Sequence, residues 1–131
     1  MSNLLSKDQI LSADDLQTKD VYVKPWGGCV RIRTMTAHER DQFEQQILTN
    51  KGGKKERMDD IRATLASLAV VDEDGKRLFT DKDVKALSKK SAAAMDQIFG
   101  EAQELNAVRD QDVEELAKNS EETPDDNSDG A

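Results

Sequence analysis

The hydrophobic and polar positions of the chain follow a two-residue period near the N-terminus. Val21–Val23 is rich in β-forming residues, and Cys29–Arg33 alternates so that its apolar side chains share one face. Alternation of this kind is typical of a β-strand with one buried face. Gly27-Gly28 lies between the two segments and supplies the positive-φ freedom that a tight turn requires. The pattern therefore predicts a β-hairpin over about 21–34.

After this hairpin the period changes to three and four residues. Thr36 and Glu39 have the spacing of a capping box, in which the hydroxyl and the carboxylate each accept from the other residue's amide. Phe43 and Ile47 lie four residues apart and form a narrow apolar stripe. We therefore expect a helix over about 37–48.

The same helical period recurs along the rest of the chain, which indicates further helices with one buried face. Long helices are expected over about 56–69 and 91–105, and short ones after Thr80 and after Asp110. The apolar positions that define these helices are Met58, Ile61, Leu65, Leu68, Val84, Leu87, Met95, Ile98, Phe99, Ala102, Leu105, Val113 and Leu116.

Two regions carry weaker patterns. Near the N-terminus, Ser6 or Asp8 is placed to open a short helix, and Ser12 is placed to cap a further turn. In the middle of the chain, Val70-Val71 precedes Asp74-Gly75, a strong turn pair, and another apolar pair follows it. We expect a small hairpin or turn there.

Together these elements predict a single α+β domain that is mainly helical, with an N-terminal β-hairpin packed beside a cluster of four to five helices. A length of 131 residues suits one domain. From Asn119 onward the sequence NSEETPDDNSDGA contains five acids, no base and almost nothing apolar. Such a segment buries too little to offset the entropy of ordering. We therefore expect a domain over 1–118 and a disordered acidic tail over 119–131.

Charge narrows the classes of partner. The formal net charge is −8 and the isoelectric point is near 4.7, which weighs against nucleic acid and anionic membranes as partners. No apolar run approaches the length of a membrane span, and no signal peptide is apparent. Cys29 is the single cysteine, which excludes an internal disulfide and favours a reducing cytoplasm.

Motifs for chemistry are weak, so we expect no catalytic residues, no cofactor and no metal. The segment 72–83 differs from a calcium-binding loop because Gly75 is fourth rather than sixth and no glutamate closes it. Gly52-Gly53-Lys54 lacks the spacing of a phosphate-binding loop. Cys29 and His38 form the one conceivable nucleophile–base pair, and nothing in the sequence orients them.

Binding of another protein is the remaining class of function. Trp26 follows Pro25 at the hairpin turn, where an aromatic either covers the core or anchors a partner. Arginines on the polar strand face are either solvated or directed at an acidic partner. The candidate partner-binding residues are Trp26, Arg31, Arg33, Phe43 and Phe99.

Three motifs carry a family resemblance. They are WGGCVRIR at 26–33, DEDGKRLFTD at 72–81 and EELAKN at 114–119. With the intervening segments, from about residue 11 to 119, they resemble the tail assembly chaperones of long-tailed (siphovirus-type) bacteriophages and prophages. None of the three motifs is a catalytic signature.

The resemblance implies a non-enzymatic assembly factor in the host cytoplasm that is absent from the mature virion. Its expected partners are the tape measure protein, which it keeps soluble, and the tail tube protein, bound mainly through a longer form of the chaperone. The alternative is a minor structural tail or connector protein of the virion. The oligomeric state stays open.

In this family the longer form is often made by a programmed −1 ribosomal frameshift. Ala117-Lys118-Asn119 can be encoded GCA AAA AAC, which contains the slippery heptamer A AAA AAC. A slip near Lys118-Asn119 would replace the acidic tail by a different domain. The competing interpretation is an ordinary helix end with Asn at the cap.

Overall fold

The computed structural model describes residues 3–50 and 52–122. Strands β1 (Thr18–Val23) and β2 (Gly28–Arg33) pair in antiparallel register, with Val21 opposite Val30. The 3-10 turn η1 (Lys24–Trp26) joins them, and Gly27 follows it with a positive φ of 69°. The predicted hairpin is thus confirmed, and it is Gly27 that adopts the left-handed conformation.

A third strand extends the hairpin. β3 (Val70–Val71) pairs antiparallel with Arg31 and Ile32, which gives the sheet order β1-β2-β3. The predicted small hairpin or turn also forms, because the Gly75 amide donates to the Asp72 carbonyl, the Leu78 amide donates to the Val70 carbonyl, and Val71 bridges to Arg77. Both valines are buried, and their pairing with β2 is the part that the sequence did not predict.

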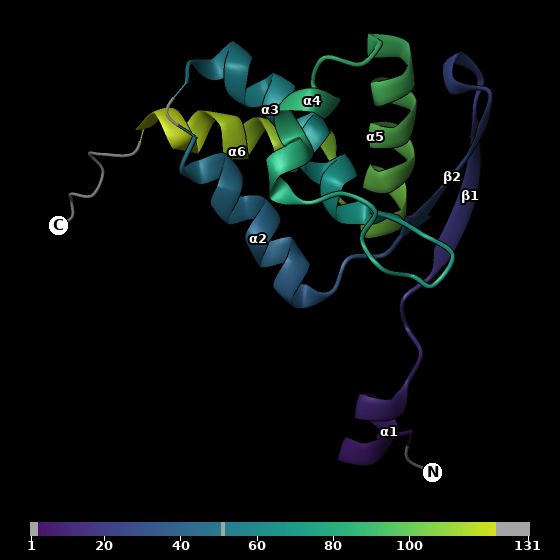
Figure 1. Cartoon of the computed structure of the whole chain (residues 1–131). Helices are drawn as coiled ribbons and strands as arrows, with labels where there is room; N and C mark the ends of the chain where they lie inside the picture. The colour runs from purple at the N-terminus through teal and green to yellow at the C-terminus, as the bar shows by residue number, and fades with distance from the viewer. Residues whose placement is uncertain (1–2, 51, 123–131) are drawn as a thin grey trace, which may run out of the picture.

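The helices follow in the predicted order, and Figure 1 shows them beside the hairpin. α3 lies centrally, with contacts to α2, α4, α5 and α6, and α5 covers the inner face of the sheet. The bounds are α2 (Ala37–Leu48), α3 (Lys54–Ala69), η2 (Asp81–Asp83), α4 (Val84–Leu87), α5 (Ala92–Asn106) and α6 (Asp110–Glu122). The predicted α+β class, mainly helical with an N-terminal hairpin, is confirmed.

The core forms where α3 meets the other helices and the inner sheet face. The second half of α3 and all of β3 are buried, apart from the half-buried Arg62. On the sheet side, Lys19 forms an ion pair with Glu101 of α5 at 2.6 Å, and Gln97 donates to the Tyr22 carbonyl at 2.7 Å. The largest fully buried apolar side chains are Phe43, Ile32, Ile47, Ile61, Leu65, Leu68, Ile98, Val23, Val70 and Val108.

Helix α1 (Lys7–Ser12) stands apart from this core, and Figure 1 shows it beyond the start of β1. Ser6 caps it, as one of the two predicted caps. The further turn predicted after Ser12 does not form, because Ala13 is extended and leads into β1. None of the α1 residues is buried.

At the other end, α6 continues through Glu122. Helical structure thus extends a few residues past the boundary predicted at 118, and the high helix propensity of glutamate favours this extension. Residues 123–131, which make up most of the predicted disordered tail, lie outside the described residues. Within the described ranges, no helix is both long and apolar enough to cross a bilayer.

Candidate binding surface

The outer face of the sheet is left uncovered by the helices. Asp20 and Arg31 lie opposite each other on β1 and β2, and the Arg31 guanidinium donates from Nε and Nη2 to the two Asp20 oxygens at 2.7 and 3.0 Å. These hydrogen bonds lower the pKa of Asp20 and raise that of Arg31. Arg31 is therefore held flat on the sheet by a partner on the neighbouring strand.

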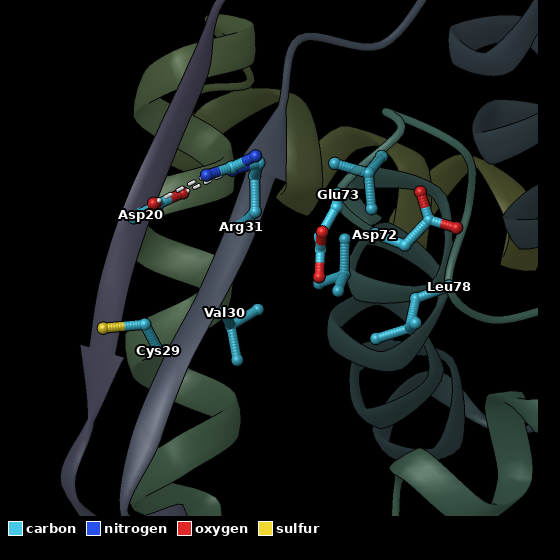
Figure 2. A pocket seen from close by; sticks show the side chains of 9 residues that line it. Asp20, Cys29, Val30, Arg31, Asp72, Glu73 and Leu78 are labelled. Atoms are coloured by element: carbon cyan, nitrogen blue, oxygen red, sulfur yellow. Dashed lines mark hydrogen bonds and ion pairs between the residues drawn. The ribbon is translucent and has the colours of Figure 1, made fainter.

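A groove of about 310 Å³ lies between β2 and the segment that follows β3. In Figure 2, Val30 on β2 and Leu78 stand on opposite sides of it. The other lining residues are Asp20, Cys29, Arg31, Val70, Val71, Asp72 and Glu73. The groove thus has apolar walls and charged residues around its rim, and we call it the sheet groove.

An open strand edge borders the sheet groove. β3 pairs only with Arg31 and Ile32, so within the described residues no strand covers the earlier part of β2 on this side. The Thr34 amide donates to the Gln17 carbonyl at 2.9 Å, so the backbone polar groups of Thr34 face β1. In an antiparallel pair, successive residues direct these groups alternately toward and away from the partner strand. That alternation directs the backbone amide and carbonyl of Cys29 toward the groove.

A second apolar depression, the Trp26 pocket, lies at the tip of the hairpin. It measures about 340 Å³ and is formed where η1 approaches α4 and the segment before it. Trp26 keeps 37% of its surface exposed there. The lining residues are Trp26, Phe79, Asp83, Ala86, Leu87 and Lys90.

Arg33 has a structural role in this arrangement. Its guanidinium donates to both Glu39 oxygens at 2.7 and 2.8 Å and to the Gly75 carbonyl at 2.8 Å. The two charged side chains keep only 15% and 13% of their surface exposed. Arg33 therefore ties β2 to the start of α2 and to the 72–75 turn.

The structure does not bring the five candidate residues together. Phe43 is fully buried in the core, and Phe99 packs half-buried against it. Arg31 borders the sheet groove, whereas Trp26 lines the other depression. In this conformation only the latter two reach a surface depression, and they belong to different ones.

Sequence reasoning missed Leu78 and Phe79, which line the two depressions. They follow the Asp-Gly turn, and their period matched neither a helix nor a long strand. Leu78 is 55% exposed. The signal in the sequence was an apolar pair shortly after a strong turn pair.

Among the described residues, side chains suited to catalysis or metal binding do not come together at either depression. No cluster of His, Cys, Asp and Glu within the described residues could hold a metal ion. Cys29 is exposed on the sheet, and His38 is exposed in the first turn of α2. No hydrogen bond joins these two side chains in the described structure.

An α+β domain with an apolar groove beside an open strand edge and an aromatic-lined pocket has the features of a protein-binding domain. Residues 7–119 match the sequence profile of the family described as phage tail assembly chaperone. Because this match covers most of the chain, the chain belongs to that family, as the sequence motifs predicted.

The fold is similar to a solved structure described as the bacteriophage HK97 tail assembly chaperone. The TM-score is 0.57 at 17% sequence identity, and the superposition covers 75% of this chain and 94% of that chain. At this identity the likeness establishes the fold alone. No curated protein matches the chain.

Proposed function

We propose that this chain binds the tape measure protein during tail assembly, keeps it soluble and helps recruit tail tube subunits. The family match over residues 7–119 carries this proposal. The chain acts by binding alone, without catalysis, in the host cytoplasm, and it leaves the assembly before the virion is complete.

The sheet groove is the surface that fits such a client best. Val30 and Leu78 offer apolar contacts, and the Asp20–Arg31 pair and Glu73 surround them with charge. A groove of this size buries a few apolar side chains, which suits a contact that is made and released. Burial of each such side chain contributes roughly 1.5–3 kcal/mol.

Co-expression with the tape measure protein tests the proposal. The intact chain is expected to raise the soluble fraction of the client, and Leu78→Asp to abolish the gain, because a carboxylate in the apolar groove loses its hydration. Leu48→Asp is the matched control, since Leu48 is 42% exposed on α2, away from both depressions. Circular dichroism establishes that both variants fold. A client that stays insoluble with the intact chain contradicts the proposal.

The finished particle separates this function from that of a structural tail or connector protein. Mass spectrometry of purified virions is expected to show none of this chain. Stoichiometric presence in particles would establish the structural role instead.

The longer form is tested at the nucleotide level. Codons for Lys118 and Asn119 that re-pair in the −1 frame are expected, together with a larger product that binds the tail tube protein. Codons that cannot re-pair exclude the slip at this position.

A further inference from the structure

The backbone at the open edge of β2 has hydrogen-bonding groups directed at the sheet groove. The amide and carbonyl of Cys29 point away from β1, and within the described residues no strand pairs with them. Two residues further along β2, Arg31 uses the same edge to pair with Val71 of β3. A further strand placed beside Cys29 would therefore extend the sheet from the point where β3 ends.

The sheet groove lies beside this edge and offers apolar contacts to such a strand. The residue paired with Cys29 would share its face of the sheet, and the two neighbours of that residue would share the face of Val30. Figure 2 shows the Val30 side chain on the groove side of β2, with Leu78 across from it. The groove thus selects apolar side chains at every second position of an added strand.

The charge of the sheet groove selects the sign of the other side chains. Asp20 and Arg31 neutralise each other across the hairpin. Asp72 and Glu73 also line the groove, and neither forms an ion pair with a described residue. The Asp72 carboxylate accepts from two amides of its own turn at 2.8 and 3.1 Å, which leaves its negative charge in place. The two uncompensated carboxylates favour Lys or Arg in the occupant.

The other open edge of the sheet, along β1, is less suited to pairing. The β1 residues whose backbone points away from β2 are Thr18, Asp20 and Tyr22. The Tyr22 carbonyl is already engaged, since it accepts from the Gln97 side chain at 2.7 Å. Lys19 and Asp20 place charges in this strand, and charged side chains are a common protection of sheet edges.

We propose that the client enters the sheet groove as an extended segment that adds a strand to the edge of β2. The segment pairs with the Cys29 backbone, buries alternate apolar side chains against Val30 and Leu78, and places Lys or Arg beside Glu73. This inference rests on the proposed function and specifies the chemistry of the client segment. Because main-chain hydrogen bonds do not read sequence, the groove accepts different segments that keep this pattern.

Amide exchange at one residue tests the pairing directly. Cys29 and Tyr22 are the single cysteine and the single tyrosine of the chain, so ¹⁵N labelling of each residue type gives one backbone signal. The probes are overlapping peptides that cover the tape measure protein. The peptides that bind the intact chain are expected to alternate apolar and basic residues. They should slow exchange of the Cys29 amide at least about tenfold and leave the Tyr22 amide unchanged.

Proline substitution gives a second, independent readout. Cys29→Pro removes the amide that faces the groove and no hydrogen bond of the β1–β2 ladder, so it is expected to weaken peptide binding at least about tenfold. Tyr22→Pro is the matched control, because Tyr22 lies opposite Cys29 and its amide faces the other edge. The control is expected to leave the affinity unchanged, and circular dichroism establishes that both variants fold.

Charge reversal tests the basic residue of the client. Glu73→Lys is expected to weaken binding of the same peptides at least about tenfold at low salt, and to favour peptides in which the basic residue is replaced by Glu. Glu115→Lys is the matched control, since Glu115 is exposed on α6 and does not line the sheet groove. It makes the same change in net charge and is expected to leave the affinity nearly unchanged.

Four results overturn the inference. They are protection of the Tyr22 amide instead of the Cys29 amide, equal affinities of the two proline variants, equal effects of the two charge reversals, and no binding peptide although the intact chain solubilises the client. Protection of the Cys29 amide at raised chain concentration without peptide also overturns it, because the edge then pairs with a second copy.

These failures are distinguishable from failure of the proposed function. In each of them the intact chain still raises the soluble fraction of the tape measure protein in co-expression, and the proposed function stands. If the client stays insoluble with the intact chain and no peptide binds, the proposed function and this inference fail together.

Discussion

Helices α1 and α3 differ in how their ends and their faces are stabilised. α1 has a complete capping box, in which Ser6 Oγ accepts from the Gln9 amide at 3.1 Å and the Gln9 side chain accepts from the Ser6 amide at 2.8 Å. It buries nothing. α3 begins after Gly53 with no side-chain cap, yet its second half is almost entirely buried.

The difference shows that a cap specifies where a helix starts. Burial of the helix decides how strongly a substitution in it changes the stability of the whole domain. A six-residue helix is marginal in water on its own, because nucleation costs more than its few hydrogen bonds return. α3 forms with a poor cap because packing stabilises it. α1 has a good cap but lacks the packing that stabilises α3.

Substitution of a core residue should give the largest difference in stability between the core and the α1 region. Phe43→Ala empties a fully buried site that faces the other helices, and we expect a loss of about 3–5 kcal/mol in the free energy of unfolding. The measurement is urea denaturation followed by circular dichroism. Leu11→Ala in the α1 region is the matched control, expected to change stability by less than about 0.5 kcal/mol. Comparable losses for the two would break the comparison.

The largely buried ion pair between Arg33 and Glu39 should give the next largest effect on stability. Glu39→Gln removes the charge that faces Arg33 while keeping an acceptor for the Thr36 amide, and we expect a loss of about 1–3 kcal/mol. The control is Glu44→Gln, which removes the exposed pair with Arg40 and is expected to cost less than about 1 kcal/mol. Equal losses would show that burial does not distinguish the two pairs.

The sequence predicted those parts of the fold in which local chemistry and burial agree. Thr36 and Glu39 predicted the start of α2, and the spacing of Ile61, Leu65 and Leu68 predicted the buried face of α3. These signals lie within one element, and their periods are unambiguous. Helix ends and hairpin position therefore came out correctly to within a few residues.

Long-range pairings were the part that sequence alone could not predict. The addition of β3 to the sheet depends on where α3 delivers Val70 and Val71, which no local pattern encodes. The same holds for Arg33. Its strand position predicts a side chain that is solvated or directed at a partner, whereas the structure pairs it with Glu39 and the Gly75 carbonyl. Surface depressions are made by segments distant in sequence, so their lining was visible only in the structure.

Two serine caps of the same kind sharpen the comparison further. Ser91 Oγ accepts from the Ala94 amide at 3.1 Å at the start of α5, which covers the sheet. Ser91→Ala is expected to lower the free energy of unfolding by about 1 kcal/mol. Ser6→Ala removes an equivalent cap from α1 and is expected to leave the urea midpoint unchanged, because α1 is outside the cooperative unit. A shift of the midpoint by Ser6→Ala would place α1 within that unit.

The smallest expected effect is a dependence of stability on acidic pH. It should arise in the helical domain and not in the α1 region. The Arg109 amide and guanidinium hydrogen-bond to Asp112 at the start of α6, which lowers the pKa of that carboxyl below its ordinary value of 3.8. A depressed folded-state pKa contributes stability that is present above the unfolded value and is lost as the pH falls through the folded value. Asp112→Asn is therefore expected to make unfolding less steeply dependent on pH below about 4, measured by urea midpoints across that range.

Asp14→Asn, in the linker after α1, is expected to leave the slope unchanged, since Asp14 makes no side-chain hydrogen bond in the described structure. Equal effects of the two substitutions would assign the acid sensitivity to overall charge and not to the contact at α6.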